Sequence, residues 1–392
     1  MLRPLNPAMA ATFASPVVEA QKWLVGVEHP TDRPLINVSQ AAPIDPPREG
    51  LRQAIAEAAL TNPRAHLYGP VLGNGDLREA LADKWRRTYG GAVAAGNIAI
   101  TQGCNQAFVA AVATLAGAGD EVILPTPWYF NHKMWLDMAG ARAVPLPTGP
   151  DLMPDPERAR ALITDRTRAI SLVSPNNPGG VEYPPALLRA FFDLCRAHGI
   201  ALLLDETYRD FLSADGAPHD LFQDPNWDDT LIQLYSFSKA YRLTGHRVGA
   251  MAASTARLEE VEKFLDTVSI SASQLGQIGA LWGLRHLEDW LGRERAEVLV
   301  RRAAMVRGME TLDGWQVLGS GAYFAYVRHP DPRASNVYAK ALVREAGLLM
   351  LPGTMFRPEG DPDGGREMRI AFANIDAATI GEMIGRLGSR SL

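Results

Sequence analysis

Residues 168–208 read RAISLVSPNNPGGVEYPPALLRAFFDLCRAHGIALLLDETY, and this stretch decides the fold. It holds two short apolar runs, at residues 168–173 and 201–204, with an amphipathic segment between them. That segment, residues 184–198, begins with prolines and is followed by Gly199, and these residue types start and stop helices. Because the order is strand, helix, strand, the stretch predicts a βαβ unit and therefore a parallel sheet.

The same alternation of short apolar runs and longer amphipathic segments continues along the middle of the chain. It predicts further strands at residues 97–101, 121–124, 141–146 and 230–235, and a further helix at residues 104–116. We therefore expect an α/β fold with a mostly parallel sheet between helices.

The pattern changes after about Ser254, where a long, charged and largely helical stretch runs to about Met309. Apolar strands follow at residues 315–327 and 368–373. This change predicts a second, smaller α+β domain, to which the N-terminal segment is expected to cross. The expected domains are a large one at residues 48–275 and a small one made of residues 1–47 and 276–392.

The composition disfavours several classes of protein. The 392 residues carry 39 Lys and Arg against 44 Asp and Glu, a net charge of −5 without a basic run, so we expect neither nucleic acid nor a membrane as a partner. The longest apolar stretch, residues 107–118, is shorter than the roughly 18 residues of a spanning helix. Two cysteines, Cys104 and Cys195, make neither a disulfide framework nor a zinc site. We expect no bound metal and a cytoplasmic location.

Polar residues follow the predicted strands at the edge of the sheet where parallel α/β sheets bind ligands. Asp205 follows three leucines, so its carboxylate is expected to be partly buried and to need a cationic neighbour, although a helix cap is also compatible with it. Lys239 comes just after another apolar run, with Ser236 and Ser238 before it. Together with Arg247, they offer an amine nucleophile beside hydroxyl and guanidinium donors that suit a phosphate.

Three motifs occur in a fixed order: NNPGG at residues 176–180, DETYRDF at residues 205–211 and SFSKAYRLTGHRVG at residues 236–249. They resemble the class I/II aminotransferases, the fold type I family of the aspartate aminotransferase superfamily that uses pyridoxal 5′-phosphate. The resemblance extends from about Tyr68 to Arg369. It implies a mainly parallel seven-stranded sheet between helices and a smaller α+β domain. It also implies an enzyme that moves an amino group from an amino acid to a 2-oxo acid by a ping-pong mechanism.

The resemblance assigns roles to individual residues. Lys239 matches the Schiff-base lysine and proton shuttle, and Asp205 matches the acid paired with the pyridine nitrogen. Asn177 and Tyr208 match donors to the ring 3-oxygen, so the implied catalytic residues are Lys239, Asp205 and Tyr208. Arg369, with Asn177, matches the group that binds the substrate α-carboxylate. The other implied cofactor-binding residues are Gly103, Cys104, Asn105, Tyr129, Ser236, Ser238 and Arg247.

Four details of the resemblance leave alternatives open. Tyr68 matches a tyrosine that reaches the phosphate of the neighbouring subunit, which implies a homodimer with active sites at the subunit interface, but a packed turn tyrosine also fits. Tyr129 is expected to stack on the cofactor, with Trp128 as the competitor. Cys104 is interpreted as a small helix-start residue rather than a reactive thiol. Residues 39–43, SQAAP, lack the glycine that precedes the proline in many relatives, so the substrate wall stays undefined.

Other activities are compatible with the same scaffold. A carbon–sulfur β-lyase, or another elimination or cyclising enzyme, would keep every cofactor residue and differ only in the substrate wall. A pyridoxal phosphate-sensing domain of a transcription regulator would need a preceding DNA-binding domain, for which the sequence leaves little room. The aromatic residues Tyr323, Phe324 and Tyr326 indicate either an apolar pocket for the amino donor or an ordinary alternating strand.

Overall fold

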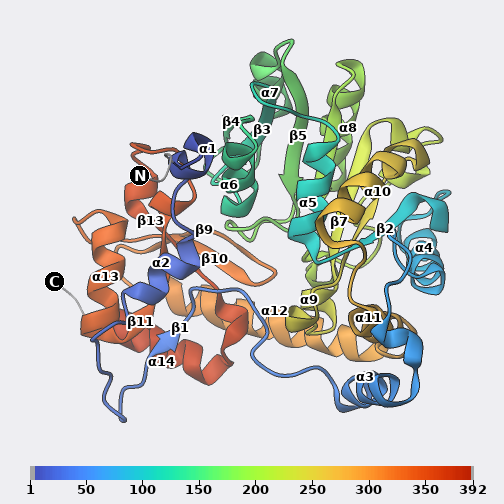
Figure 1. Cartoon of the computed structure of the whole chain (residues 1–392). Coiled ribbons are helices and arrows are strands. Elements are labelled where there is room, and N and C mark those ends of the chain that lie inside the picture. Colours follow the sequence, from blue (N-terminus) through green and yellow to red (C-terminus); the bar gives the residue numbers. More distant parts are fainter. Residues whose placement is uncertain (1–4, 390–392) are drawn as a thin grey trace.

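A seven-stranded sheet forms the centre of the fold in the computed structural model, which describes residues 5–389 (Figure 1). In spatial order its strands are β2 (Ile98–Thr101), β8 (Gly249–Ala252), β7 (Leu231–Ser236), β6 (Ala201–Asp205), β5 (Thr167–Val173), β3 (Glu121–Thr126) and β4 (Arg142–Pro147). All neighbours from β7 to β4 are parallel, whereas β8 runs antiparallel to both β2 and β7. The predicted α/β fold with a mainly parallel sheet is therefore confirmed.

Helices cover both faces of this sheet because its central strands are apolar on both sides. On β6, Leu203 packs into one apolar cluster, and Leu202 and Leu204 pack into another. Successive strand residues point to opposite faces, so one strand contributes to two cores. The first core includes residues of α5 (Cys104–Ala113), α6 (Phe130–Met138) and α10 (Thr255–Ser269). The second includes residues of α4 (Gly75–Tyr89), α7 (Pro156–Leu162) and α8 (Pro185–Ala197).

Strand β8 was not predicted from the sequence. Its four residues, GAMA, include no β-branched or aromatic side chain and have low intrinsic preference for a strand. Hydrogen bonding to both β2 and β7 imposes the extended conformation. Gly249 also permits a close approach, because a Cβ on it would lie 2.5 Å from the carbonyl carbon of Gly103. This contact places the start of α5 against the sheet.

The helical stretch expected at residues 254–309 consists of three helices, namely α10, α11 (Gln274–His286) and α12 (Glu288–Glu310). Ser254 and Ser273 start two of them, since each hydroxyl accepts a hydrogen bond of 3.3 Å from a backbone amide in the first turn. Helix α11 packs on α4 and on α3 (Glu49–Thr61).

A second, antiparallel sheet follows α12. The strand expected at residues 315–327 is a hairpin of two strands, because the chain turns at Ala322, which has a φ of +45°. In spatial order the strands are β12 (Leu351–Pro352), β13 (Glu367–Ile370), β10 (Phe324–Arg328) and β9 (Gln316–Gly321). Two further helices of this region are α13 (Ser335–Ala346) and α14 (Ala377–Gly388), and α14 packs on α12.

The N-terminal segment joins both parts of the molecule (Figure 1). Strand β1 (Ile36–Asn37) pairs in parallel with β11 (Leu348–Leu349). Two short helices precede it: α1 (Pro7–Ala11) packs against α6, and α2 (Pro16–Lys22) contacts β12. The domain boundaries drawn from the sequence stay a prediction. In the described part of the chain, no helix has both the length and the apolar character needed to cross a membrane.

Candidate active site

A cavity of about 430 Å³ lies at the carboxyl edge of the parallel strands. Strand β6 carries Asp205 to it, and β7 carries Ser236. The predicted site residues that line it are Cys104, Asn105, Tyr129, Asn177, Asp205, Tyr208, Ser236, Ser238, Lys239, Arg247 and Arg369. Of the other predicted residues, Gly103 lies just behind this lining, whereas Tyr68 is 79% exposed and lies outside it.

Asp205 is buried at the end of β6, and polar groups surround its carboxylate. The Thr207 amide donates a hydrogen bond of 2.9 Å to Oδ1, and Nε2 of His132 lies 3.4 Å from Oδ2. Burial alone would raise the pKa of this carboxyl group, but the interactions with His132 and Thr207 outweigh burial and lower the pKa. Asp205 therefore presents a negative charge to the cavity at neutral pH.

Lys239 lies on the one-turn helix α9 (Phe237–Ala240), directly after β7. Its Nζ donates a hydrogen bond of 2.5 Å to the carbonyl oxygen of Ala41. Burial, and then the positive charges of Arg247 and Arg369, lower the pKa of this amine to about 8. Because only a neutral amine acts as a nucleophile or a base, this pKa brings the reactive form close to neutral pH.

Arg247 and the start of α5 form a corner that suits an anion. Gly103 precedes α5 with a φ of +84°, which favours glycine, and a Cβ on it would lie 2.2 Å from Nη2 of Arg247 and displace the guanidinium. Nη1 of Arg247 donates to the Thr244 carbonyl oxygen at 2.9 Å and lies 3.4 Å from Oγ of Ser238. The first backbone amides of a helix carry partial positive charge, and with a guanidinium beside them they can hold a phosphate.

Arg369 reaches the cavity from β13 of the second sheet. Its Nη1 donates a hydrogen bond of 3.0 Å to Oδ1 of Asn177, and its Nη2 donates to the carbonyl oxygen of Ser39. The ring centroids of Phe324 and Phe356 lie 5.1 and 5.0 Å from the guanidinium carbon of Arg369. Burial lowers its pKa to about 10, so the group stays protonated at neutral pH. Nε has no hydrogen-bond partner among the described residues, which leaves a donor for a carboxylate.

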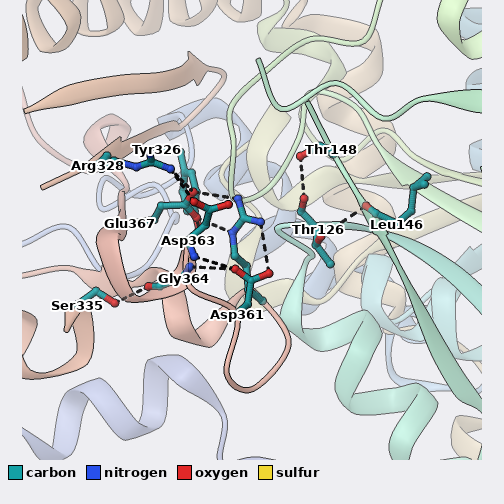
Figure 2. Close-up of polar contacts among 11 residues, drawn as sticks. Thr126, Leu146, Thr148, Tyr326, Arg328, Ser335, Asp361, Asp363, Gly364 and Glu367 are labelled. Atoms are coloured by element: carbon teal, nitrogen blue, oxygen red, sulfur yellow. Dashed lines mark hydrogen bonds and ion pairs between the residues drawn. The ribbon is translucent and has the colours of Figure 1, made fainter. Parts of the chain in front are cut away.

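The strand that carries Arg369 is held by a buried carboxylate two residues earlier. Figure 2 shows Glu367 beside Tyr326, whose hydroxyl donates a hydrogen bond of 2.9 Å to Oε2. Nε of Arg357 donates to the same oxygen at 2.6 Å. Charge-assisted hydrogen bonds of this kind are strong when buried, so they fix the position of β13 and with it the guanidinium.

The two candidate stacking rings occupy different places. Tyr129 lines the cavity, and its hydroxyl donates a hydrogen bond of 3.2 Å to Oδ1 of Asn105. Trp128 is buried in the core beside α5, and Nζ of Lys133 lies 5.7 Å from its ring centroid. This placement favours Tyr129 as the ring that faces a bound cofactor.

The aromatic residues of the β9–β10 hairpin do not line the cavity. Tyr323 and Phe324 pack behind Tyr208, with ring centroids 5.4 and 5.2 Å from its ring. Tyr326 is fully buried in the core beneath Phe356. Of the two interpretations of this segment, the structure therefore supports a core strand rather than the wall of a substrate pocket.

Two residues next to the site were not predicted. His132 lies on α6 with its ring stacked on Phe108, at 3.6 Å between centroids, and faces Asp205. Asn374 donates from Nδ2 to the carbonyl oxygen of Gln40 and accepts from the Ala42 amide at 3.2 Å. Asn374 thus holds Gln40 and Ala42, the two residues that flank Ala41, whose carbonyl oxygen accepts the hydrogen bond from Lys239. Neither residue lies in a motif, and only the tertiary fold brings them to the site.

Cys104 is the first residue of α5 and contacts Asp205. Its Sγ lies 3.5 Å from Oδ1 of that carboxylate, at a distance that suits a thiol donor. Burial, and then the charge of Asp205, raise the pKa of the thiol well above its ordinary value. These surroundings oppose a reactive thiolate and agree with a small residue at the start of a helix.

Residues 33–387 match the family model described as aminotransferase class I and II. The aromatic aminotransferase ISS1 of Arabidopsis thaliana is 29% identical over 358 residues, which cover 87% of this chain and 86% of that protein. The arginine–pyruvate transaminase AruH of Pseudomonas aeruginosa is 31% identical over 295 residues, which cover 74% and 75%. Among solved structures, aspartate aminotransferase from Thermus thermophilus with maleate superposes with a TM-score of 0.88 at 26% identity, covering 99% of this chain and 100% of that chain. The names of these three proteins refer to different amino acids, namely aromatic amino acids, arginine and aspartate.

Proposed function

Because the chain belongs to the aminotransferase class I and II family, we propose that it moves an amino group from an amino acid to a 2-oxo acid by a ping-pong mechanism with pyridoxal 5′-phosphate. Family membership makes it an enzyme of the aminotransferase class, as its motifs predicted. The single observation that carries the proposal is the convergence of Lys239, Asp205 and Arg369 on one cavity.

The residues of the cavity fit this cofactor. Asp205 is a buried anion that can pair with a protonated pyridine nitrogen. Arg247 and the amides at the start of α5 can hold the phosphate, since Gly103 leaves room for the guanidinium there. Lys239 could condense with the aldehyde group, with release of water, because the neutral form of its amine is accessible near neutral pH. When bound, pyridoxal phosphate supplies an electron sink for the charge left on the substrate α-carbon.

Two protein side chains would control the protons of the reaction, one at the ring nitrogen of the cofactor and one at the substrate α-carbon. Asp205 would keep the ring nitrogen protonated, since two opposite charges ~4 Å apart at an effective dielectric of about 20 attract by roughly 4 kcal/mol. With its pKa lowered to about 8, the free amine of Lys239 would act as the base that takes the proton from the substrate α-carbon. Tyr208, buried beside Lys239, can donate a hydrogen bond to the ring 3-oxygen together with Asn177.

Arg369 would orient the substrate. Its planar guanidinium can grip an α-carboxylate in a bidentate manner, and Asn177 and the Ser39 carbonyl oxygen already fix its plane. Holding the carboxylate fixes the α-carbon relative to Lys239, which is the positioning that proton abstraction needs.

We further propose a homodimer in which Tyr68 of one chain reaches the phosphate in the cavity of the other. The loop that holds it lies next to the end of α10, because the Gly69 amide donates to Oγ of Ser271 at 3.3 Å. The exposed apolar side chains there are Leu67, Tyr68, Val268 and Ile270. An apolar patch of this kind is typical of a surface that another protein chain covers.

A single-turnover assay tests the proposal. Protein loaded with pyridoxal phosphate is mixed with an amino acid and no acceptor, and both 2-oxo acid and ammonia are measured. Transamination produces at most one 2-oxo acid per subunit, without ammonia, until an acceptor oxo acid is added. Continuous release of ammonia and oxo acid would instead indicate the β-lyase activity.

A further inference from the structure

The motif DETYRDF at residues 205–211 supplies side chains to both faces of the seven-stranded sheet. Asp205 and Tyr208 line the cavity. Glu206 continues β6 beyond its last residue, because its amide donates a hydrogen bond of 2.9 Å to the Leu234 carbonyl oxygen of β7. Successive residues of a strand point to opposite faces. The Glu206 side chain therefore points away from Asp205, to the face of the sheet on which α4 packs.

The carboxylate of Glu206 accepts three hydrogen bonds at one oxygen. Oη of Tyr89 donates to Oε2 at 2.6 Å, Nε2 of Gln233 at 2.7 Å and Nε2 of His219 at 3.3 Å. The Leu221 amide donates to Nδ1 of His219 at 3.2 Å, so the ring proton lies on Nε2, which makes Nε2 a donor. Glu206 and its three partners are each 1% exposed, so a second chain cannot reach this cluster.

Backbone hydrogen bonds link this cluster to the cavity. The Arg209 amide donates a hydrogen bond of 3.1 Å to the Glu206 carbonyl oxygen, which closes a turn directly after β6. Within the same turn, the Thr207 amide donates to Oδ1 of Asp205 at 2.9 Å. Any displacement of Glu206 would therefore move both the peptide that carries Asp205 and the amide that orients its carboxylate.

Glu206 keeps a negative charge inside the protein. Burial alone would raise the pKa of this carboxyl group, but the interactions with His219, and then with Arg209 and Tyr89, outweigh burial and lower the pKa. A buried carboxylate is costly unless such partners surround it, and an apolar side chain would need none of them. What the carboxylate adds is direction, because three donors from α4, β7 and a loop hold it in one place.

We propose that Glu206 is a positioning residue, whose hydrogen bonds behind the sheet hold the end of β6 so that the carboxylate of Asp205 meets the ring nitrogen of the cofactor. The inference rests on the proposed aminotransferase function and adds a residue to its machinery. The attraction between Asp205 and a protonated nitrogen depends on their separation. Loss of the Glu206 hydrogen bonds would therefore weaken this pairing, whereas the phosphate corner at Arg247 would keep its own contacts.

Two cofactors that differ at one ring atom test the inference without measuring turnover. In the deaza analogue of pyridoxal phosphate a C–H group replaces the ring nitrogen, so Asp205 has no charge to pair with. Cofactor-free protein is titrated with each compound, and the Kd for pyridoxal phosphate is divided by the Kd for the analogue. Glu206→Met removes the acceptor at similar volume, and we expect this ratio to rise at least about fivefold. Glu206→Gln restores an acceptor oxygen and should recover most of the change.

A buried carboxylate at the opposite edge of the same sheet provides the matched control. Glu121 begins β3 and accepts a hydrogen bond of 2.7 Å from Oγ1 of Thr164. Glu121→Met should leave the ratio within about twofold of the wild type, because it disturbs the sheet without touching the end of β6. Thermal unfolding checks that each variant folds. If Glu206→Met does not fold, Tyr89→Phe removes a single donor instead and should raise the ratio at least about twofold.

The outcomes separate the inference from the proposed function. An unchanged ratio in the folded variant of the cluster, or an equal rise in Glu121→Met, would overturn the positioning role and leave the proposed function standing. Equal weakening of both compounds also leaves the ratio unchanged, and it would assign Glu206 to general support of the fold. Wild-type protein that binds neither compound would overturn both proposals.

Discussion

The guanidinium of Arg369 donates a hydrogen bond of 3.0 Å to Oδ1 of Asn177, a residue 192 positions earlier in the chain. One residue lies on β13 of the second sheet and the other in the loop after β5 of the first. This contact joins the two sheets at the cavity. A substrate carboxylate bound by Arg369 would therefore be held relative to groups on both sheets.

Arg369→Lys should lower kcat/KM for every amino acid by about 10- to 100-fold, because a charge-assisted hydrogen bond contributes roughly 1.5–3 kcal/mol. An ammonium group cannot contact Asn177, Ser39 and a carboxylate in one plane. Steady-state kinetics with several donors measures the loss. A loss confined to one donor would assign Arg369 to the side-chain subsite instead.

His132→Phe should raise the pKa of Asp205, because the interaction with His132 is the largest of the effects that lower it. Phenylalanine preserves the stacking on Phe108 and removes only the polar edge. We expect weaker cofactor binding, with the acidic limb of the binding curve moved to higher pH. Equilibrium titration of the cofactor-free protein with pyridoxal phosphate between pH 5 and 8 measures this shift. An identical pH dependence in both proteins would show that His132 does not tune the carboxylate.

Lys239→Met should stabilise the cofactor-free protein at neutral pH. The folded protein lowers the pKa of Lys239 to about 8 from an ordinary value of 10.5, so between these two values the unfolded chain binds more protons. Stability of the wild type should therefore rise with pH across that window, and the advantage of Lys239→Met should shrink. Urea unfolding at pH 7 and pH 10 measures both. If the difference in the free energy of unfolding between Lys239→Met and the wild type is the same at both pH values, the lowered pKa of Lys239 is contradicted.

Asn374→Ala should lower stability by about 1–3 kcal/mol, since it leaves the Gln40 carbonyl oxygen and the Ala42 amide without their partner. It should also reduce kcat/KM, because Ala41 between them meets Lys239. Asn374→Asp retains the acceptor for the Ala42 amide but turns a buried, negatively charged oxygen toward the Gln40 carbonyl oxygen, so it should lose at least as much stability as Asn374→Ala. Chemical unfolding and steady-state kinetics report the two effects. Unchanged stability and kcat/KM in Asn374→Ala would show that the hydrogen bonds to Gln40 and Ala42 contribute nothing.

Mixing two impaired chains should restore activity if Tyr68 acts across the dimer. Homodimers of Tyr68→Ala and of Lys239→Ala would each carry two defective sites. A hybrid dimer would combine both defects in one site and leave the other intact. After subunit exchange we expect up to a quarter of wild-type activity, since half of the dimers are hybrids with one good site each. Activity that never exceeds the average of the separate homodimers would place Tyr68 outside the partner's site.

The sequence predicted the core of the fold because local patterns encode it. The apolar runs that became β5 and β6, and the proline-led helix between them, could be located before any tertiary contact was known. Strand β8 could not, because its small residues become a strand only through pairing with β2 and β7. Likewise, the single helical stretch after Ser254 is three helices: the second begins at the serine cap Ser273, and the third follows Leu287, which provides no side-chain cap.

The same distinction applies to the candidate site. Asp205 and Lys239 follow strands of the sheet directly, so topology alone predicts that they meet at its carboxyl edge. Helix packing brings His132 next to the cavity, the 3-10 helix after β13 brings Asn374 next to it, and Val18 of α2 lines it. Such contacts depend on three-dimensional arrangement, and the sequence carries no local signal for them.

Covalent attachment at Lys239 is the most direct test of the proposed chemistry. Protein loaded with pyridoxal phosphate is reduced with borohydride, digested, and analysed by peptide mass spectrometry, with Lys239→Ala treated in parallel. We expect the mass of the reduced cofactor on the peptide that contains Lys239 and on no peptide of the variant. A reduced adduct on another lysine, or none on any peptide of the loaded wild type, would contradict the assignment of Lys239.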